Sequence, residues 1–376
     1  MSVLLIIGAS ARAAVASARQ SSWAIHAMDM FGDIDTRAQS NFQLLNNYPT
    51  DCISLLPDVQ PDAICVTGAM ENHPNVLQEL TTRGTLLAPA VDQIARMRDP
   101  FDLQAVLASS RFQYPRTFAS NEPLPLEETP WLKKPIASAA GQGIHAIDNT
   151  HTSSLDPTMI IQERIPGRHI SAGFLMHPAH TELLGCTEQL LGHSEFQASK
   201  YQYCGSIGPL HVPASINRQI LELGKFLQLE YGLRGLIGVD LILHDEQLWL
   251  IEINPRYTAS MELFESRYNR SMIQLHLDSF SSKPANFNCI NHPKIHYGKA
   301  ILFARTTTQI PIEFHPIWQA ALNCRRPTVA DLPAIGATVL AGHPLFTIFA
   351  RSESTAETKA KLQRQAAAFY NRLYDA

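Results

Sequence analysis

The stretch from residue 235 to residue 265, GLIGVDLILHDEQLWLIEINPRYTASMELFE, constrains the fold of this chain more than any other segment. Residues 239–243 and 248–253 are β-branched, apolar runs separated by a polar turn over 244–247, which predicts a hairpin of two strands. Side chains alternate between the two faces of a strand, so Glu252 and Asn254 point the same way. Folding at the turn places Asp240 close to a position opposite Glu252.

Three oxygen-bearing side chains on one face of a hairpin predict a site for a hard cation. Magnesium usually takes one or two carboxylates from a protein and completes its octahedron with water and nucleotide phosphates, so a sparse set is sufficient. The alternative is that Asp240 and Glu252 are exposed polar positions of an amphipathic sheet. Both strands are apolar enough to be buried, where an uncompensated carboxylate costs several kcal/mol. We therefore expect Asp240, Glu252 and Asn254 to bind Mg²⁺, or Mn²⁺ in its place, with Arg256 as a fixed cation beside them.

Two further segments upstream suit a nucleotide. Lys134 is followed by a loop of small residues, IASAAGQGI over 136–144. Backbone N–H groups of such a loop can approach anionic oxygens closely, and the loop can close as a lid. It lacks the ending of a P-loop and the spacing of a dinucleotide fingerprint, so an ordinary turn is the alternative. Residues 159–171 then predict a strand, a turn at Pro166-Gly167 and a second strand, and the end of the first strand can contact an adenine edge.

In this order the three segments resemble the ATP-grasp superfamily, whose members share a lysine before a Gly-rich lid, a linker strand that holds adenine, and a closing acidic metal pair. The resemblance implies an α/β chain with the α+β ATP-grasp fold, and ATP and Mg²⁺ as cofactors. It assigns catalytic roles on the phosphoryl group to Arg256 and Lys134. The residues that it assigns to ATP are Lys134, Ser138, Gly141, Gly143, Gln162, Glu163, Ile165 and His169.

The chain departs from the family pattern at two positions. The family usually has an acidic residue after the linker turn to hold the ribose hydroxyls, and His169 stands there. The family also has an earlier nucleotide lysine in an Asp-Lys pair, and here the sequence is Arg98-Asp99-Pro100. Imidazole can still form a hydrogen bond with a hydroxyl, and Arg98 can reach a phosphate.

Three domains are expected from the order of the apolar segments. Residues 1–92 alternate short strands (3–7, 24–28 and 63–67) with helical segments, which predicts a small parallel α/β domain. The ATP-grasp domain is expected over 93–280, with a lid subdomain at about 114–170. Residues 281–376 predict a β-rich C-terminal lobe that ends in a helix over 355–374.

Six residues are weaker candidates for contact with the acceptor substrate. The carboxyl ends of parallel strands form the ligand crevice of open α/β sheets, and Arg12, Asp29 and Glu71 follow the three predicted strands. Arg12 suits a substrate carboxylate, although a tight strand-to-helix turn explains its position equally well. The other three candidates, from a Gly- and aromatic-rich loop and from the segment after the hairpin, are Lys200, Ser260 and Glu262.

Composition limits the partners of this chain. The formal net charge of −4 provides no basic face for nucleic acid or an anionic membrane, and no apolar run approaches the roughly 20 residues that span a bilayer. The six cysteines form no CxxC pair, which argues against a zinc site and for reduced thiols in the cytoplasm. We expect small-molecule carboxylate and amine substrates, and a homodimer is a possible assembly.

The resemblance also implies a reaction. ATP-grasp ligases convert a carboxylate into an acyl phosphate and join it to an amine, with ADP as product. Residues 28–37, together with the NPRYTASME segment, resemble uncharacterised ATP-grasp proteins of bacteria with one-carbon carrier cofactors, and the active-site segment is similar to tyramine–glutamate ligases. We therefore expect an amino acid such as glutamate to be joined to an amine in cofactor assembly. An ATP-grasp kinase or carboxylase and a nucleotide-binding regulatory module are the alternatives.

Overall fold

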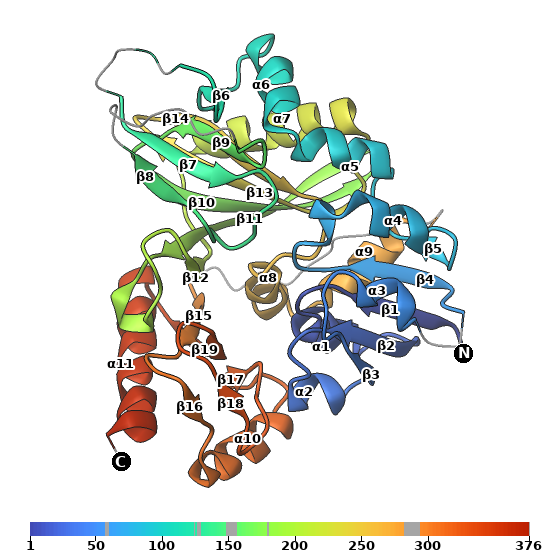
Figure 1. Ribbon diagram of the computed structural model, residues 1–376, viewed down its shortest axis with the longest axis vertical. Coiled ribbons are helices and arrows are strands. Elements are labelled where there is room, and N and C mark those ends of the chain that lie inside the picture. The colour runs from blue at the N-terminus through green and yellow to red at the C-terminus, as the bar shows by residue number, and fades with distance from the viewer. Residues whose placement is uncertain are drawn as a thin grey trace.

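The computed structural model describes residues 1–56, 60–123, 125, 129–147, 156–178, 180–281 and 294–375. A parallel N-terminal sheet, a small lid sheet and a C-terminal lobe surround one large antiparallel sheet (Figure 1). The predicted α/β fold class is confirmed. The predicted domain limits stay a prediction, and the stretch just after residue 281 lies outside the described residues.

The N-terminal sheet is parallel and has the strand order β3-β2-β1-β4-β5. Its central strand β1 has the predicted bounds, and its residues 4–7 are fully buried. A strand covered on both faces reads as a continuous apolar run, which explains the VLLII segment. The strands are β1 (Val3–Ile7), β2 (Ala24–Asp29), β3 (Asn41–Leu44), β4 (Ala63–Val66) and β5 (Thr85–Leu86). The helices are α1 (Arg12–Ala18), α2 (Ile34–Arg37), α3 (Asp51–Ser54), η1 (Met70–Asn72) and α4 (Pro74–Leu80).

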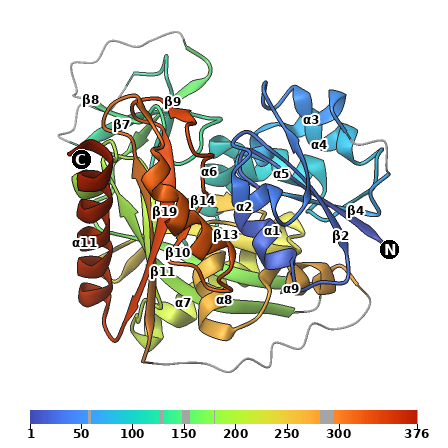
Figure 2. The same cartoon turned by 90° about the horizontal axis from the view of Figure 1, so that it is seen from below.

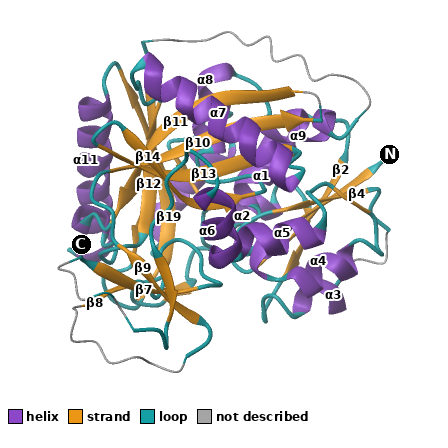
Figure 3. Ribbon diagram, turned by 90° about the horizontal axis from the view of Figure 1, so that it is seen from above, coloured by secondary structure: helices purple, strands orange, loops and turns teal. Residues whose placement is uncertain are grey.

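Two helices lead from this sheet to the lid. Helix α5 (Val91–Arg98) ends where α6 (Pro100–Ala108) begins, and the carboxylate of Asp99 accepts a hydrogen bond from the amide of Phe101. The lid sheet is antiparallel and has the strand order β6-β9-β7-β8. Its strands β7, β8 and β9 are labelled together at the lower left of Figure 3. Its strands are β6 (Thr117–Ala119), β7 (Trp131–Pro135), β8 (His145–Ile147) and β9 (Met159–Glu163).

The large sheet runs β14-β13-β10-β11-β12-β15-β19-β17 and crosses the expected domain boundary. Strands β15, β17 and β19 were expected in a separate C-terminal lobe, but β15 pairs with β12 and so extends the sheet of the ATP-binding part. Gly205 permits this pairing, because a Cβ there would lie 2.2 Å from the carbonyl oxygen of Lys299. The strands are β10 (Arg168–His177), β11 (His180–Leu191), β12 (Tyr203–Gly208), β13 (Gly235–His244), β14 (Gln247–Asn254), β15 (His296–Phe303), β17 (Val329–Ala330) and β19 (Pro344–Ser352).

Helices cover the large sheet and close its C-terminal end. Helix α7 (Ala214–Tyr231) buries an apolar stripe, and its Gly224 lets it approach the ring of Phe174 on β10 closely. The terminal helix α11 (Thr355–Tyr374) has the predicted bounds and packs along β19 (Figure 2). The remaining elements are η2 (Ser194–Phe196), α8 (Met261–Tyr268), α9 (Met272–Ser279), β16 (Thr308–Gln309), η3 (Ile312–Phe314), α10 (His315–Leu322) and β18 (Thr338–Val339).

Two other expectations concern cysteines and membranes. Cys52, Cys65, Cys186, Cys204 and Cys324 are free thiols, and Cys289 lies outside the described residues. Within the described part of the chain, no helix is both long enough and apolar enough to cross a bilayer.

A buried histidine joins the N-terminal part to the large sheet. His276 on α9 accepts a hydrogen bond at Nδ1 from the amide of Leu236 (2.9 Å), so its Nε2 carries the proton and donates to the carbonyl oxygen of Leu87 (3.0 Å). Burial lowers the pKa of His276 to about 4. The folded state therefore binds fewer protons than the unfolded state between the ordinary histidine pKa and pH 4.

We expect His276 to make stability depend on pH. The contribution of the neutral His276 to the free energy of unfolding is fully present above pH ~6.5 and is lost as the pH falls towards 4. The loss is at most roughly 3 kcal/mol. Urea unfolding at pH 7 and at pH 4.5 measures this loss, which His276→Gln should reduce. His315→Gln, at an exposed histidine, should leave it unchanged. An equal acid sensitivity in wild type and His276→Gln would contradict the assignment.

Candidate active site

The predicted hairpin of β13 and β14 is confirmed. Asp240 lies directly opposite Glu252, and Gly238 lies opposite Asn254. The turn at Asp245 and Glu246 has positive φ angles of 46° and 62°, which match the twist of a tight hairpin. The register shifts between Asp240 and Leu241, because β14 has one extra residue between their partners Glu252 and Leu250. Such a bulge is common beside active sites.

The electrostatics of this pair suit a bound cation. The carboxylate of Asp240 accepts hydrogen bonds from Nε2 of Gln189 (2.9 Å) and Nδ2 of Asn254 (3.3 Å). Burial raises the pKa of Asp240 to about 7, and the charge of Glu252 contributes to the shift. Two facing carboxylates that resist simultaneous ionisation are stabilised when a cation lies between or beside them.

The predicted donor set fits magnesium. Asp240 and Glu252 supply carboxylate oxygens and Asn254 supplies an amide oxygen, which are the hard donors that Mg²⁺ prefers. Among the described residues, no three His, Cys, Asp or Glu side chains converge as a complete metal site. A sparse protein set of this kind leaves coordination positions for nucleotide phosphates and water.

Cationic side chains flank the hairpin. Arg98 pairs with Glu252, and its Nε donates to Oδ1 of Asn72 (3.1 Å). Arg256 donates to Oδ1 of Asn254 (3.2 Å) and makes a two-point ion pair with Glu71 (2.7 and 2.8 Å). Glu71 was expected to contact the substrate, and in the structure its carboxylate pairs with Arg256 inside the site.

Lys134 on β7 faces the same region. Its Nζ donates to Oε1 of Gln162 (2.8 Å), and Nε2 of Gln162 donates to Oγ1 of Thr117 (2.9 Å). Desolvation lowers the pKa of Lys134, and the charge of Glu252 opposes this shift while that of Arg98 adds to it. Lys134 thus belongs to the same electrostatic cluster as the acidic pair, although it lies more than a hundred residues upstream.

The adenine-side candidates lie on β9 and at the start of β10. Glu163 accepts a hydrogen bond from Nε of Arg116 (3.0 Å), and Ile165 is buried in the turn that follows. His169 borders a pocket of about 430 Å³, which Gln189, the partner of Asp240, also lines. Burial lowers the pKa of His169, so its imidazole is suited to hydrogen bonding as a neutral group. The roles of these residues towards ATP stay predictions.

The small-residue loop is held over the site from two sides. The carbonyl oxygen of Ser138 accepts a hydrogen bond from Nδ2 of Asn72 (3.2 Å), and that of Ala140 accepts one from the amide of Tyr203 (3.0 Å). Gly141 adopts a φ of 76°, and a Cβ there would lie 2.0 Å from the carbonyl oxygen of Tyr201. This close backbone approach explains the glycine.

We expect nucleotide to protect this loop. ATP with Mg²⁺ should slow proteolysis between residues 138 and 144, because phosphates on the backbone amides hold the loop closed. Asn72→Ala should remove part of the protection by deleting the contact with Ser138. Limited proteolysis with mass detection measures both effects, and exposed sites on α11 serve as the internal control. Equal cleavage with and without nucleotide would mean that the loop is not a lid.

Several expected substrate contacts have partners within the protein. Arg12 is buried and pairs with Glu262 and Asp331. The carboxylate of Asp29 accepts three backbone amides, those of Ala11, Phe31 and Gly32. These contacts stabilise the turns of the N-terminal domain, and the structure therefore supports the structural interpretation of the Arg12 turn.

The remaining candidates differ in accessibility. Lys200 is exposed, with its Nζ 5.5 Å from the centre of the Tyr201 ring. Ser260 is at the N-cap of α8, where its hydroxyl shares a hydrogen bond with that of Thr258 (3.0 Å) and caps no helix amide.

Sequence patterns gave no signal for other members of the site. Gln189 and Asn72 stand in ordinary polar contexts, and only folding brings them to Asp240 and to Arg98. Their partners are distant in sequence, so no local spacing identifies them.

Comparisons with known proteins agree with this geometry. Residues 97–260 match the family model of the ATP-grasp domain. This part of the chain is an ATP-grasp domain. An uncharacterised protein of Methanocaldococcus jannaschii is 20% identical over 370 residues, covering 92% of this chain and 88% of its own. The D-alanine–D-alanine ligase of Petrotoga mobilis is 26% identical over 161 residues, covering 39% of this chain and 54% of the ligase.

The fold comparison extends beyond the ATP-grasp domain to nearly the whole chain. The biotin carboxylase of Campylobacter jejuni superposes with a TM-score of 0.74 at 13% identity, covering 95% of this chain and 89% of that structure. At this identity the likeness shows the fold alone. The superfamily predicted from the three segments is therefore confirmed, and the domain together with its relatives indicates an ATP-dependent ligase.

Proposed function

We propose that this ATP-grasp protein is an ADP-forming carboxylate–amine ligase. The observation that carries the proposal is the half-buried Asp240–Glu252 pair, which has Asn254 beside it and the cations Lys134 and Arg256 close enough to interact electrostatically. This arrangement concentrates positive charge and hard oxygen ligands where a triphosphate can be held. Such a site serves phosphoryl transfer, in which positioning and charge stabilisation contribute most of the catalysis.

The reaction requires two displacements. An oxygen of the substrate carboxylate attacks the γ-phosphorus of ATP, the bond to the bridging oxygen breaks, and ADP leaves. The lone pair of the amine then attacks the acyl carbon, the carbon–oxygen bond to phosphate breaks, and the nitrogen releases a proton. Lys134 and Arg256 would stabilise the phosphoryl oxygens during the first step. Magnesium held by Asp240, Glu252 and Asn254 would neutralise phosphate charge.

The loop over residues 136–144 would protect the acyl phosphate. Water competes with the amine for this intermediate, so a closed loop favours amide formation over hydrolysis. The hydrogen bonds that Ser138 and Ala140 accept from the N-terminal domain and from β12 support this role.

We infer further that the carboxylate belongs to an amino acid such as glutamate, and that the product serves in assembly of a one-carbon carrier cofactor. This inference is supported by residues 28–37 and 254–262, which resemble uncharacterised ATP-grasp proteins of bacteria with one-carbon carrier cofactors. The active-site segment is also similar to tyramine–glutamate ligases. Asp29 accepts a hydrogen bond from the amide of Ala11, and the neighbouring Arg12 pairs with Glu262, so the two segments lie close together.

A product screen tests the function. The protein is incubated with ATP, Mg²⁺, pooled amino acids and pooled amines, and condensed products are detected by mass together with the ADP-to-AMP ratio. The proposal expects a new amide and one ADP for each amide formed. AMP as the nucleotide product would contradict it, and so would ADP formation that requires bicarbonate alone, which would favour a carboxylase.

A further inference from the structure

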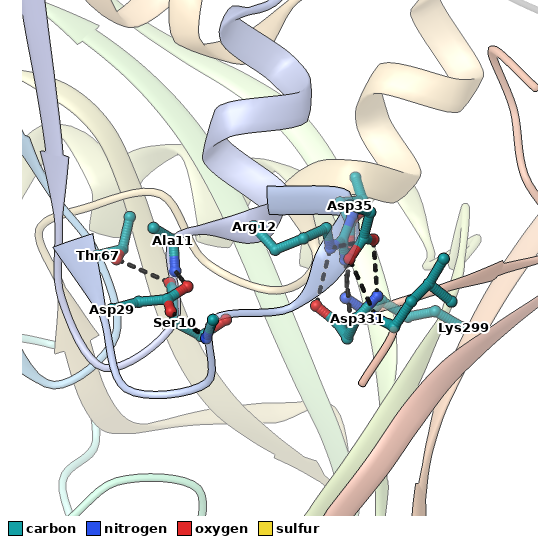
Figure 4. A network of polar contacts seen from close by, with 11 residues as sticks. Ser10, Ala11, Arg12, Asp29, Asp35, Thr67, Lys299 and Asp331 are labelled. Atoms are coloured by element: carbon teal, nitrogen blue, oxygen red, sulfur yellow. Dashed lines mark hydrogen bonds and ion pairs between the residues drawn. The ribbon is translucent and has the colours of Figure 1, made fainter. Parts of the chain in front are cut away.

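A cluster of charged side chains lies where the N-terminal sheet, α8 and the C-terminal lobe meet (Figure 4). We call it the acidic junction. It contains five carboxylates and two cations, and its members are Arg12, Asp29, Asp33, Asp35, Glu262, Lys299 and Asp331. Carboxylates therefore outnumber the cations in a largely buried region.

The two cations of the acidic junction are already paired. Arg12 donates to Glu262 and, through Nε, to Asp331 (2.8 Å), while Lys299 pairs with Glu262. Asp35 accepts hydrogen bonds from the backbone amides of Asp331 (2.9 Å) and Leu332 (3.0 Å). Glu262, Asp331 and Asp35 thus have partners, and Asp29 has the three amides described above.

Asp33 is the exception. It is buried, at 7% exposure, yet none of the described residues forms a hydrogen bond or an ion pair with its carboxylate. It is at the N-cap of α2, where aspartate usually accepts a helix amide, but this carboxylate does not do so. The amide of Ile34 donates to the carbonyl oxygen of Leu332 (2.8 Å), which holds this loop beside Asp331.

A buried carboxylate without a partner is costly unless it is protonated or meets a cation. Burial raises the pKa of Asp33 well above its ordinary value, and the charges of Asp331, Asp35 and Asp29 raise it further, against the smaller opposing effect of Arg12. The carboxylate is therefore a site where a cationic ligand would be stabilised strongly.

Resting on the proposed ligase function, we propose that the acidic junction binds an ammonium group of the acceptor substrate through Asp33, with Asp331 beside it. Asp331 retains 26% exposure of its side chain, so the junction is open on that side.

Two observations favour an organic amine over a metal ion. Among the described residues, no three acidic or imidazole side chains converge as metal ligands, although five carboxylates gather here. The loop that carries Asp33 also exposes two large apolar side chains, Met30 at 44% and Phe31 at 46%. Apolar groups beside a carboxylate match a ligand that has both a hydrocarbon body and a charged end.

The acidic junction also adjoins the phosphoryl-transfer region. On the large sheet, Ser206 of β12 lies opposite Gln189 of β11 on one side and opposite Lys299 of β15 on the other. Gln189 donates a hydrogen bond to Asp240 of the metal pair, and Lys299 pairs with Glu262 of the junction, so the same sheet connects the two sites. A substrate held at Asp33 can extend from the junction towards the site of acyl transfer.

Binding of a simple diamine tests the proposal. Calorimetric titration of the full chain, saturated with Mg²⁺ and a non-hydrolysable ATP analogue, uses 1,4-diaminobutane and its neutral counterpart 1,4-butanediol. The wild type should bind the diamine and not the diol. Asp33→Asn should raise the Kd of the diamine about tenfold or more, as expected for loss of a charge-assisted hydrogen bond.

The matched control is Asp245→Asn. Asp245 has a side chain with 88% exposure in the hairpin turn and a positive φ that asparagine also adopts, so this variant makes the same chemical change away from the junction. It should bind the diamine as the wild type does. Asp33→Asn should keep its affinity for the ATP analogue and its melting temperature, because it removes an unpaired charge. Asp33→Ser provides a second variant if the asparagine variant does not fold.

The outcomes separate this proposal from the ligase function. Equal diamine binding by wild type and Asp33→Asn, or binding of the diol as tightly as the diamine, would overturn the acidic junction as an ammonium site. Absence of diamine binding by the wild type would overturn it too. If diamine binding depends on Asp33 but the protein forms no amide, the ammonium site would be supported and the proposed ligase function would be contradicted.

Discussion

Glu252→Gln is expected to reduce Mg²⁺-dependent turnover by roughly 10²–10³-fold while the chain stays folded. The substitution keeps the shape of the side chain and removes one charge beside a triphosphate and a divalent ion. It also deprives Arg98 of its carboxylate partner and relieves Asp240 of a facing charge. Stability should change little, because the pair of carboxylates repels in the absence of metal.

Turnover is measured as ADP release over a range of Mg²⁺ concentrations. Glu246→Gln is the matched control, because it makes the same change at an exposed turn of the same hairpin. A second readout is the pKa of Asp240, about 7 in the wild type, which should fall when Glu252 loses its charge. If Glu252→Gln has wild-type activity and normal metal dependence, the assignment of these carboxylates as magnesium ligands would be contradicted.

Lys134→Ala should raise the Kd for ATP by roughly 10- to 100-fold. The substitution removes a partly buried ammonium group and with it a charge-assisted contact with phosphate. It also removes the hydrogen bond that Lys134 donates to Gln162. Folding should be retained, because the hydrogen bond between Gln162 and Thr117 remains.

Nucleotide affinity is measured by titration with a fluorescent ATP analogue. Lys133→Ala is the control: Lys133 is the neighbouring residue of the same strand β7, and alternation directs its side chain to the opposite face of the lid sheet. Its affinity should match that of the wild type. Comparable weakening by both variants would indicate a general loss of lid structure and would contradict a specific phosphate contact for Lys134.

Local patterns predicted the elements that carry the site. The two apolar runs within residues 239–253 and the polar turn between them predicted the hairpin, with Asp240 close to a position opposite Glu252. Continuous apolar runs predicted β1, and the polar, Ala-rich segment predicted α11 with its bounds. These features depend on neighbours within a few residues, so sequence periodicity contains the required information.

Contacts between distant segments could not be predicted in this way. Arg12 was expected to be available to a substrate, but Asp331, 319 residues away, and Glu262 occupy its guanidinium. The addition of β15 to β12 joins the C-terminal lobe to the large sheet through a pairing that neither strand's pattern encodes. Asp33 lies in an ordinary acidic turn of the sequence. Only the structure, in which its carboxylate is buried without a partner among the described residues, identifies it as a candidate binding residue.

The proposed function depends on activation of a carboxylate as an acyl phosphate. Hydroxylamine detects this step directly, since it converts acyl phosphates to hydroxamates and requires no knowledge of the natural amine. The protein is incubated with ATP, Mg²⁺, hydroxylamine and single amino acids, beginning with glutamate. We predict one hydroxamate for each ADP with at least one amino acid, and neither product with Glu252→Gln. ADP release with no hydroxamate from any carboxylate, or hydroxamate formation with AMP, would rule out this chemistry.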